Sequence, residues 1–202
     1  MLNKYFHATR DNLDFVFLNA VLKNIYFALI SLDYIFNHSD FNYGIYHDKH
    51  TFYFFHIQSI LTACGNISNV FYNNSHFDLK KQNETTKRCQ RLRTLLNISK
   101  ERYPLIFQKE VRNTNEHFDE RYDEVGEIGD YNLLDNDTDT FIRDVIMTNK
   151  HLRTYDIMSF VYYTYGRNME KISYDFKKLR DELTNLRDCI NDNPTLSSAW
   201  EE

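Results

Sequence analysis

The sequence predicts a mainly α-helical fold, a helical bundle with a C-terminal β-hairpin and a last helix appended. Three observations support this. The 202-residue chain has only 5 glycines and 2 prolines, which favours long helices with few turns. Apolar residues recur every three or four positions over most of the first 126 residues, the spacing of amphipathic helices. A late segment then changes to β-branched and aromatic residues around a glycine, as in a hairpin.

The composition is that of a globular protein. Hydrophobic residues make up 42% and aromatic residues 16%, and the length suffices for one domain with its own core. No repeat, low-complexity tract or linker divides the sequence, so residues 1–202 are predicted to form a single domain. The net charge of −5 and the pI near 5.9 argue against a broad basic surface that grips duplex nucleic acid.

The N-terminal bundle, residues 1–126, is predicted to contain four helices. Each is indicated by apolar residues at helical spacing, and polar stretches separate them. The first helix has a wide apolar face, which includes Leu13, Val16, Ala20, Val21 and Ile25. Pro104 suits the first turn of the fourth helix, because that turn needs no N–H donor. The four predicted helices span residues 8–37, 49–73, 84–97 and 103–125.

The C-terminal part, residues 152–192, is predicted to form the hairpin and the last helix. β-branched and aromatic residues flank Gly166 and Arg167, a pair suited to a hairpin turn. Ser173 then stands as the expected N-cap of a helix over residues 174–191, whose leucines recur at helical spacing.

The cysteines indicate the compartment. Cys64, Cys89 and Cys189 are far apart, odd in number and outside any CxxC pair, so neither a disulfide framework nor a structural zinc site is predicted. A cytoplasmic location follows, and no signal peptide is recognisable at the N-terminus. The longest apolar stretch, IYFALISLDYIF, contains Asp33 and is too short to span a bilayer, so no membrane association is predicted.

The histidines offer one alternative site. His47 and His50 are three residues apart, so both could ligate a metal from one helical turn. The stretch matches no zinc signature, and a polar loop that leads into an aromatic helix explains it better. No Gly-rich phosphate loop and no GxSxG elbow occur. We therefore predict neither a metal nor a cofactor.

The charged segment VRNTNEHFDERYDE, residues 111–124, has two interpretations. Arg112 and His117 would lie about 140° apart on an ideal helix, whereas Arg112 and Glu116 would share one face. In the first interpretation, the segment is an exposed helix face on which unlike charges pair. In the second interpretation, the arginine and the histidine form a catalytic pair, brought together by a distorted turn or by a second chain.

The run RNTNEH, residues 112–117, resembles the signature of HEPN-domain proteins, in which an arginine and a polar residue precede a histidine. The resemblance covers this motif and, loosely, the helical bundle. It implies a compact bundle that forms a homodimer and cleaves RNA without a metal, at a site composed of both chains. Arg112 would bind the scissile phosphate, His117 would act as acid and base, and Asn113 would support them.

Two functions therefore remain open. The first is a metal-independent endoribonuclease of HEPN type, a toxin or defence component whose partners are an RNA substrate and an antitoxin protein. Arg88, Arg91 and Arg93 in the basic third helix are the candidates for binding the RNA backbone, and a solvated helix face is their alternative role. The second function is a non-catalytic helical scaffold that binds partner proteins through its charged face.

Overall fold

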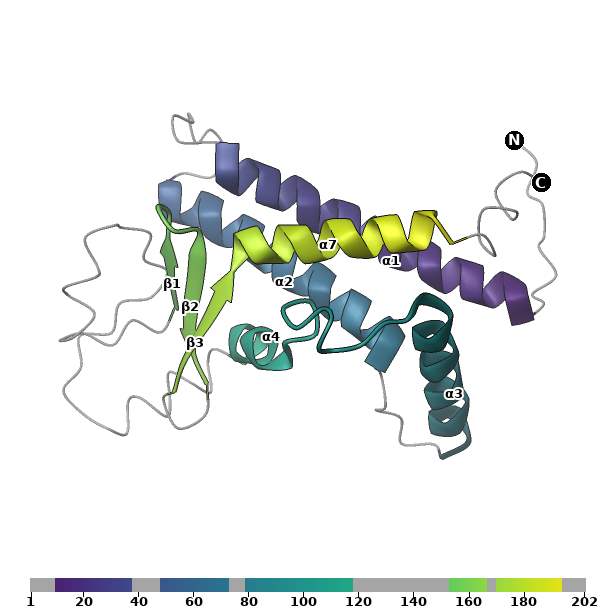
Figure 1. The fold of residues 1–202 in the computed structure, drawn as a ribbon. Coiled ribbons are helices and arrows are strands. Elements are labelled where there is room, and N and C mark those ends of the chain that lie inside the picture. Colours follow the sequence, from purple (N-terminus) through teal and green to yellow (C-terminus); the bar gives the residue numbers. More distant parts are fainter. Residues whose placement is uncertain (1–9, 38–47, 73–78, 118–152, 167–169, 194–202) are drawn as a thin grey trace.

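The computed structural model describes residues 10–37, 48–72, 79–117, 153–166 and 170–193 (Figure 1). Within these ranges the fold is mainly helical with a small C-terminal sheet followed by a helix, as the sequence predicts. The helices are α1 (Arg10–Asn37), α2 (Lys49–Tyr72), α3 (Leu79–Leu96), α4 (Lys109–Glu116) and α7 (Phe176–Asn191). The strands are β1 (Arg153–Asp156), β2 (Val161–Tyr165) and β3 (Lys171–Asp175).

Helices α1 and α2 form a long antiparallel pair, and α7 lies along them (Figure 1). Their predicted positions are confirmed to within a few residues. α1 buries a side that centres on Val21 and Ile25, and α2 buries Ile57 and Ile60, all with no exposed surface. Removing such side chains from water is the main source of folding free energy, at about 25 cal/mol per Å² of apolar area.

The buried side of α1 is narrower than the predicted apolar face, of which Val21 and Ile25 are buried as expected. Leu13 and Val16 are 43% and 59% exposed, and Ala20 is exposed as well, so they do not belong to the core. The reason is that α1 has apolar residues on two sides. By length and composition alone its segment Leu13–Asn37 would pass for a membrane span, contrary to our expectation, although 39% of the apolar window is buried inside the protein.

Helix α4 is much shorter than the predicted helix over 103–125. Residues 100–107 form turns instead, so Pro104 does not lie in a first helical turn. The backbone of these turns is bonded to other elements: the Tyr174 hydroxyl donates to the Leu105 carbonyl (2.8 Å), and the Glu182 carboxylate accepts from Leu105 N–H (3.0 Å). Residues 118–125, the remainder of the predicted helix, lie outside the described residues.

The three strands form an antiparallel sheet in the order β1-β2-β3. The predicted hairpin is confirmed as β2 and β3, where the Gly166 N–H donates to the Glu170 carbonyl (2.9 Å), and β1 is an addition. Arg167 lies outside the described residues. Ser173 is part of β3; the N-cap of α7 is Asp175, whose carboxylate accepts from two backbone N–H groups of the first turn.

One continuous cluster of buried apolar residues joins all the helices and strands described. At its sheet end, a tyrosine from each strand lies in one cross-strand row, and all three are at most 1% exposed. Their rings contact aromatic side chains of α2 and α7. The row consists of Tyr155, Tyr162 and Tyr174. The sheet is thereby packed against α2 and lies next to α4, which carries the first part of the charged motif (Figure 1).

Candidate functional site

Helix α4 carries the first part of the motif and lies against α2 and β2. It buries Val111, Thr114 and Asn115, while Asn113 and Glu116 are exposed. Its N-cap residue provides no side-chain hydrogen bond, so packing rather than capping fixes where it begins. The site is therefore positioned by the buried side of a helix of only eight residues.

Arg112 lies flat against α2 at Gly65. A Cβ atom at Gly65 would be 2.5 Å from Arg112 Cδ and 2.8 Å from one terminal nitrogen, Nη1. Side chains do not approach a real Cβ this closely, so only glycine allows this path. The Arg112 side chain is 19% exposed, which leaves its guanidinium at the edge of the core and still reachable from solvent.

The ion pair of Arg112 is with Glu116, at 3.7 Å between Nε and Oε1. This distance is too long for a hydrogen bond, and Nε has no hydrogen-bond partner in the described part of the chain. The pair is the one that the exposed-face interpretation of the sequence expects. Glu116 is itself half exposed, so its attraction for the guanidinium is weakened by solvent.

A small pocket opens beside this guanidinium. α2 contributes Cys64 and Ser68 to its wall, and α4 contributes Lys109, its first residue. Ser68 is 3% exposed, and its hydroxyl has no hydrogen-bond partner within the described ranges. The cavity has a volume of about 10 Å³, room for about one water molecule, so an anionic group such as a phosphate would meet the Arg112 and Lys109 side chains at its opening and not inside it.

His117 is the C-cap of α4 and is exposed. Its N–H donates to the Asn113 carbonyl (3.0 Å), and its backbone has already left helical geometry, at φ −114° and ψ 41°. The offset expected on an ideal helix therefore does not apply at His117. Arg112 faces the pocket on α2, whereas His117 stands at the end of α4. The acidic residues from Asp119 onward lie outside the described residues.

The motif contains two asparagines, and the structure buries the one for which the sequence predicts no role. Asn113, the predicted supporting residue, is exposed, whereas Asn115 is 5% exposed. Asn115 donates to Gln58 of α2 (3.1 Å) and accepts from Arg153 of β1 (3.4 Å). It thus joins three elements behind the motif. Its position four residues after buried Val111 is the signal that identifies it.

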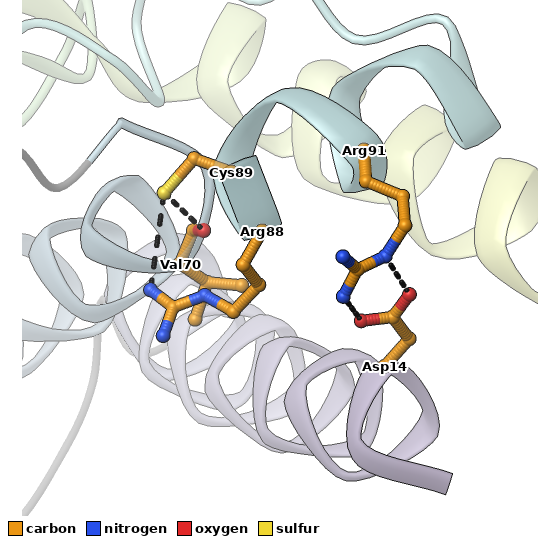
Figure 2. A network of polar contacts seen from close by, with 5 residues as sticks. All are labelled: Asp14, Val70, Arg88, Cys89 and Arg91. Carbon is orange, nitrogen blue, oxygen red and sulfur yellow. Dashed lines mark hydrogen bonds and ion pairs between the residues drawn. The ribbon is translucent and has the colours of Figure 1, made fainter. Parts of the chain in front are cut away.

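The three arginines proposed to bind RNA all contact other parts of the chain. Arg91 makes a bidentate ion pair with Asp14 of α1 (Figure 2). The Arg88 guanidinium lies 4.1 Å from the ring centre of Phe17, and Arg93 donates to the Phe71 carbonyl. These contacts attach α3 to α1 and α2, a structural role that the sequence pattern does not reveal.

Residues from β3 and α7 hold the turn that leads into α4. The Glu182 carboxylate accepts from the N–H groups of Leu105 and Ile106, each at 3.0 Å for the same oxygen. Burial raises the pKa of Glu182, and these two hydrogen bonds oppose that rise. Burial also raises the pKa of the Cys64 thiol to about 12, so this pocket cysteine is a thiol and not a nucleophilic thiolate.

The alternative metal site receives no support from the described residues. No group of three or more His, Cys, Asp and Glu side chains gathers among them, and His47 lies outside them. Asp48 caps α2 instead, where its carboxylate accepts from the Thr51 N–H (2.7 Å). All three cysteines are free thiols.

The chain matches no family model, no curated protein and no solved structure. The geometry of the site is therefore the basis for any assignment of function.

Proposed function

We propose that the protein is a metal-independent endoribonuclease of HEPN type. The observation that supports this most directly is the place of Arg112, whose guanidinium lies beside a pocket that also contains Lys109 and Ser68. Gly65 leaves the room in which the arginine lies, because a Cβ atom there would be 2.5 Å from Arg112 Cδ. Exposed His117 follows on the same short helix, where a flexible RNA strand can reach it.

The proposed reaction is transesterification within the RNA strand. The ribose 2′-oxygen attacks the neighbouring phosphorus as its proton passes to a base, and the bond to the leaving 5′-oxygen breaks as that oxygen receives a proton. Histidine exchanges protons near neutral pH, so His117 suits either transfer. Arg112 would stabilise the negative charge that builds on the phosphate. The products are a 2′,3′-cyclic phosphate and a 5′-hydroxyl.

The resemblance implies that two chains share the site. Because α4 lies against α2 and β2, a second copy would have to approach the exposed side of α4, where Asn113, Glu116 and His117 stand. An arginine of one chain would then meet the histidine of the other, which is the role of the homodimer in this proposal. As a toxin or defence component in the cytoplasm, the enzyme would be held inactive by an antitoxin protein.

The test is cleavage of a structured RNA by the purified protein in EDTA. We expect cyclic phosphate ends from the wild type and a loss of about 10²–10⁴-fold in rate in His117→Ala. Arg112→Ala should lose about 10²–10³-fold. His50→Ala, an exposed histidine on α2, is the matched control and should cleave like the wild type. Absence of cleavage by the wild type, or equal cleavage by His117→Ala, contradicts the proposal.

The second candidate is a non-catalytic scaffold that binds a partner protein. The pairing of Arg112 with Glu116 favours it, as do the contacts that the α3 arginines make within the chain. An inactive wild type that binds RNA no better than Arg112→Ala would move the assignment to this candidate.

A further inference from the structure

The outer side of α1 carries a second apolar stripe, separate from its buried side. Seven exposed positions follow one another in steps of three and four residues. Five of them are large apolar side chains between 41% and 59% exposed, and the other two are Ala20 and Lys23. The outer stripe, in full, is Leu13, Val16, Ala20, Lys23, Phe27, Ile30 and Tyr34. Alternating steps of three and four are the spacing of a coiled-coil seam.

The apolar surface continues beyond this stripe. Tyr26, 47% exposed, is one turn before Ile30 on α1. At the other end, His56 of α2 stacks on Tyr34 at 5.0 Å between ring centres and contacts the 56% exposed Phe55 at 5.2 Å. A monomeric protein rarely leaves so many large apolar side chains exposed together, so the surface marks a contact with another molecule.

We propose that a second copy of this chain covers the outer stripe, through an antiparallel contact between two α1 helices about a two-fold axis beside Lys23. The stripe complements itself in this arrangement. Residues whose numbers sum to 46 or 47 face one another, so that small Ala20 meets the partner's Phe27, and Val16 meets the partner's Ile30. Leu13 meets the partner's Tyr34. Only an isologous contact pairs one patch with itself in this way.

The area fits a stable dimer. A large apolar or aromatic side chain has roughly 150–250 Å² of surface, so the seven large exposed ones present on the order of 700 Å² per copy. Standard interfaces bury about 800 Å² per partner. These side chains are the five of the outer stripe with Tyr26 and Phe55.

A bilayer suits the outer stripe less well than a second copy does. α1 is attached to the rest of the protein near both ends, through the ion pairs of Asp14 with Arg91 and of Asp33 with Arg180. Its inner side is in the core, so α1 cannot leave the fold to cross a membrane. Lys23 also stands in the middle of the stripe. In a helix pair, a single lysine in the seam fixes the register and lowers the affinity, while its stem packs and its ammonium reaches water.

This interface is separate from the one that the nuclease proposal requires. α2 lies between α1 and α4, since α1 packs on α2 and α7 whereas α4 packs on α2 and β2 (Figure 1). The contact through α1 does not bring two Arg112–His117 motifs together. The proposed contact between two α1 helices does not depend on RNA cleavage. Its test measures the molecular mass of the assembly and not an activity.

The experiment is sedimentation equilibrium of the full chain over a wide range of concentration. The wild type should form a dimer or a larger even assembly, and the double variant Phe27→Asp, Ile30→Asp should halve its mass while circular dichroism shows the wild-type helix content. Met158→Asp is the matched control, because Met158 is 71% exposed in the β1–β2 connection and outside the stripe. Lys23→Leu should strengthen association by about tenfold or more.

A monomeric wild type overturns the proposal. The outer stripe would then be covered by a lipid surface or by another part of the chain, and not by a second copy. An unchanged mass in the double variant also overturns it. Cysteine cross-linking in a Cys189→Ser background tests the direction. Lys23→Cys, beside the axis, should form a disulfide with its own copy under mild oxidation, and Leu13→Cys should not. Equal cross-linking of the two variants contradicts the antiparallel arrangement.

Discussion

Gly65 decides where the charged end of Arg112 lies, although it has no side chain of its own. A methyl group at this position would occupy the space of Arg112 Cδ. Glycine inside a helix is otherwise unfavourable by about 0.5–1 kcal/mol relative to alanine. The protein accepts this unfavourable residue in the middle of α2, and the arginine uses the space that results.

Gly65→Ala should therefore act differently in two backgrounds. In the wild type, the new methyl group displaces Arg112, so the gain in helix propensity is offset and any RNA cleavage falls. In Arg112→Ala the obstacle is absent, and Gly65→Ala should stabilise the protein by about 0.5–1 kcal/mol. Urea unfolding of the four proteins measures this coupling. Equal effects of Gly65→Ala in both backgrounds would show that the close contact has no influence on stability.

Glu182 should make stability depend on pH. Burial raises its pKa in the folded state above the ordinary value of 4.5. A carboxyl group with a raised pKa binds its proton more tightly in the folded than in the unfolded protein. The shift in the pKa of Glu182 therefore contributes its full stabilisation below about pH 4.5. This stabilisation is lost as the pH rises through the pKa of the folded state.

The comparison that isolates this effect is wild type against Glu182→Gln, unfolded in urea between about pH 4 and pH 7. Glutamine keeps one acceptor oxygen and cannot ionise. We expect the variant to be the less stable one at the acid end, because it loses an acceptor, and to gain on the wild type as pH rises. A difference that stays constant over this range contradicts a raised pKa.

At the scale of elements, α3 depends on polar contacts for its attachment. The bidentate pair of Arg91 with Asp14 should show a coupling energy of about 0.5–1 kcal/mol in a double-mutant cycle, because Arg91 is 40% exposed and screened by solvent. The more exposed, monodentate pair of Arg180 with Asp33 is the control and should couple more weakly. Coupling energies of equal size in both cycles would show that the bidentate geometry does not strengthen the ion pair.

Elements with strong apolar periodicity could be predicted from the sequence, and elements fixed by distant contacts could not. α1, α2 and α7 follow from their own residues. α4 is shorter than its local pattern indicates, because Tyr174 and Glu182 bond the backbone of residues 105 and 106. β1 has only four residues, and pairing with β2 makes it a strand.

The site was predictable to a similar degree. The order of Arg112 and His117 along the chain is visible in the sequence, and so is the placement of Arg112 on a helix, although the predicted helix is much longer than α4. Their surroundings are not. Gly65 resembles any glycine in a helix until the fold brings Arg112 over it, and the charge pattern of α3 does not show that Arg91 pairs with an aspartate 77 residues earlier.

At the scale of the whole molecule, the continuous core should make unfolding a single event. Ile60 has no exposed surface and lies in the middle of α2, which contacts α1, α3 and α4. Ile60→Ala should lower the free energy of unfolding by about 2–5 kcal/mol. Far-UV circular dichroism, which reports helices, and near-UV circular dichroism, which reports the tyrosines, should move together. Two separate transitions would divide the protein into independent parts.

The bonds that hold the turn before α4 affect the order in which a ribosome produces a working site. Arg112 emerges from the ribosome well before Tyr174 and Glu182, whose side chains bond the backbone of that turn. A nascent chain that ends before β3 thus has the motif without the partners that position it. If the chain cuts RNA, its activity then begins only after β3 and α7 have been synthesised and have folded onto this turn.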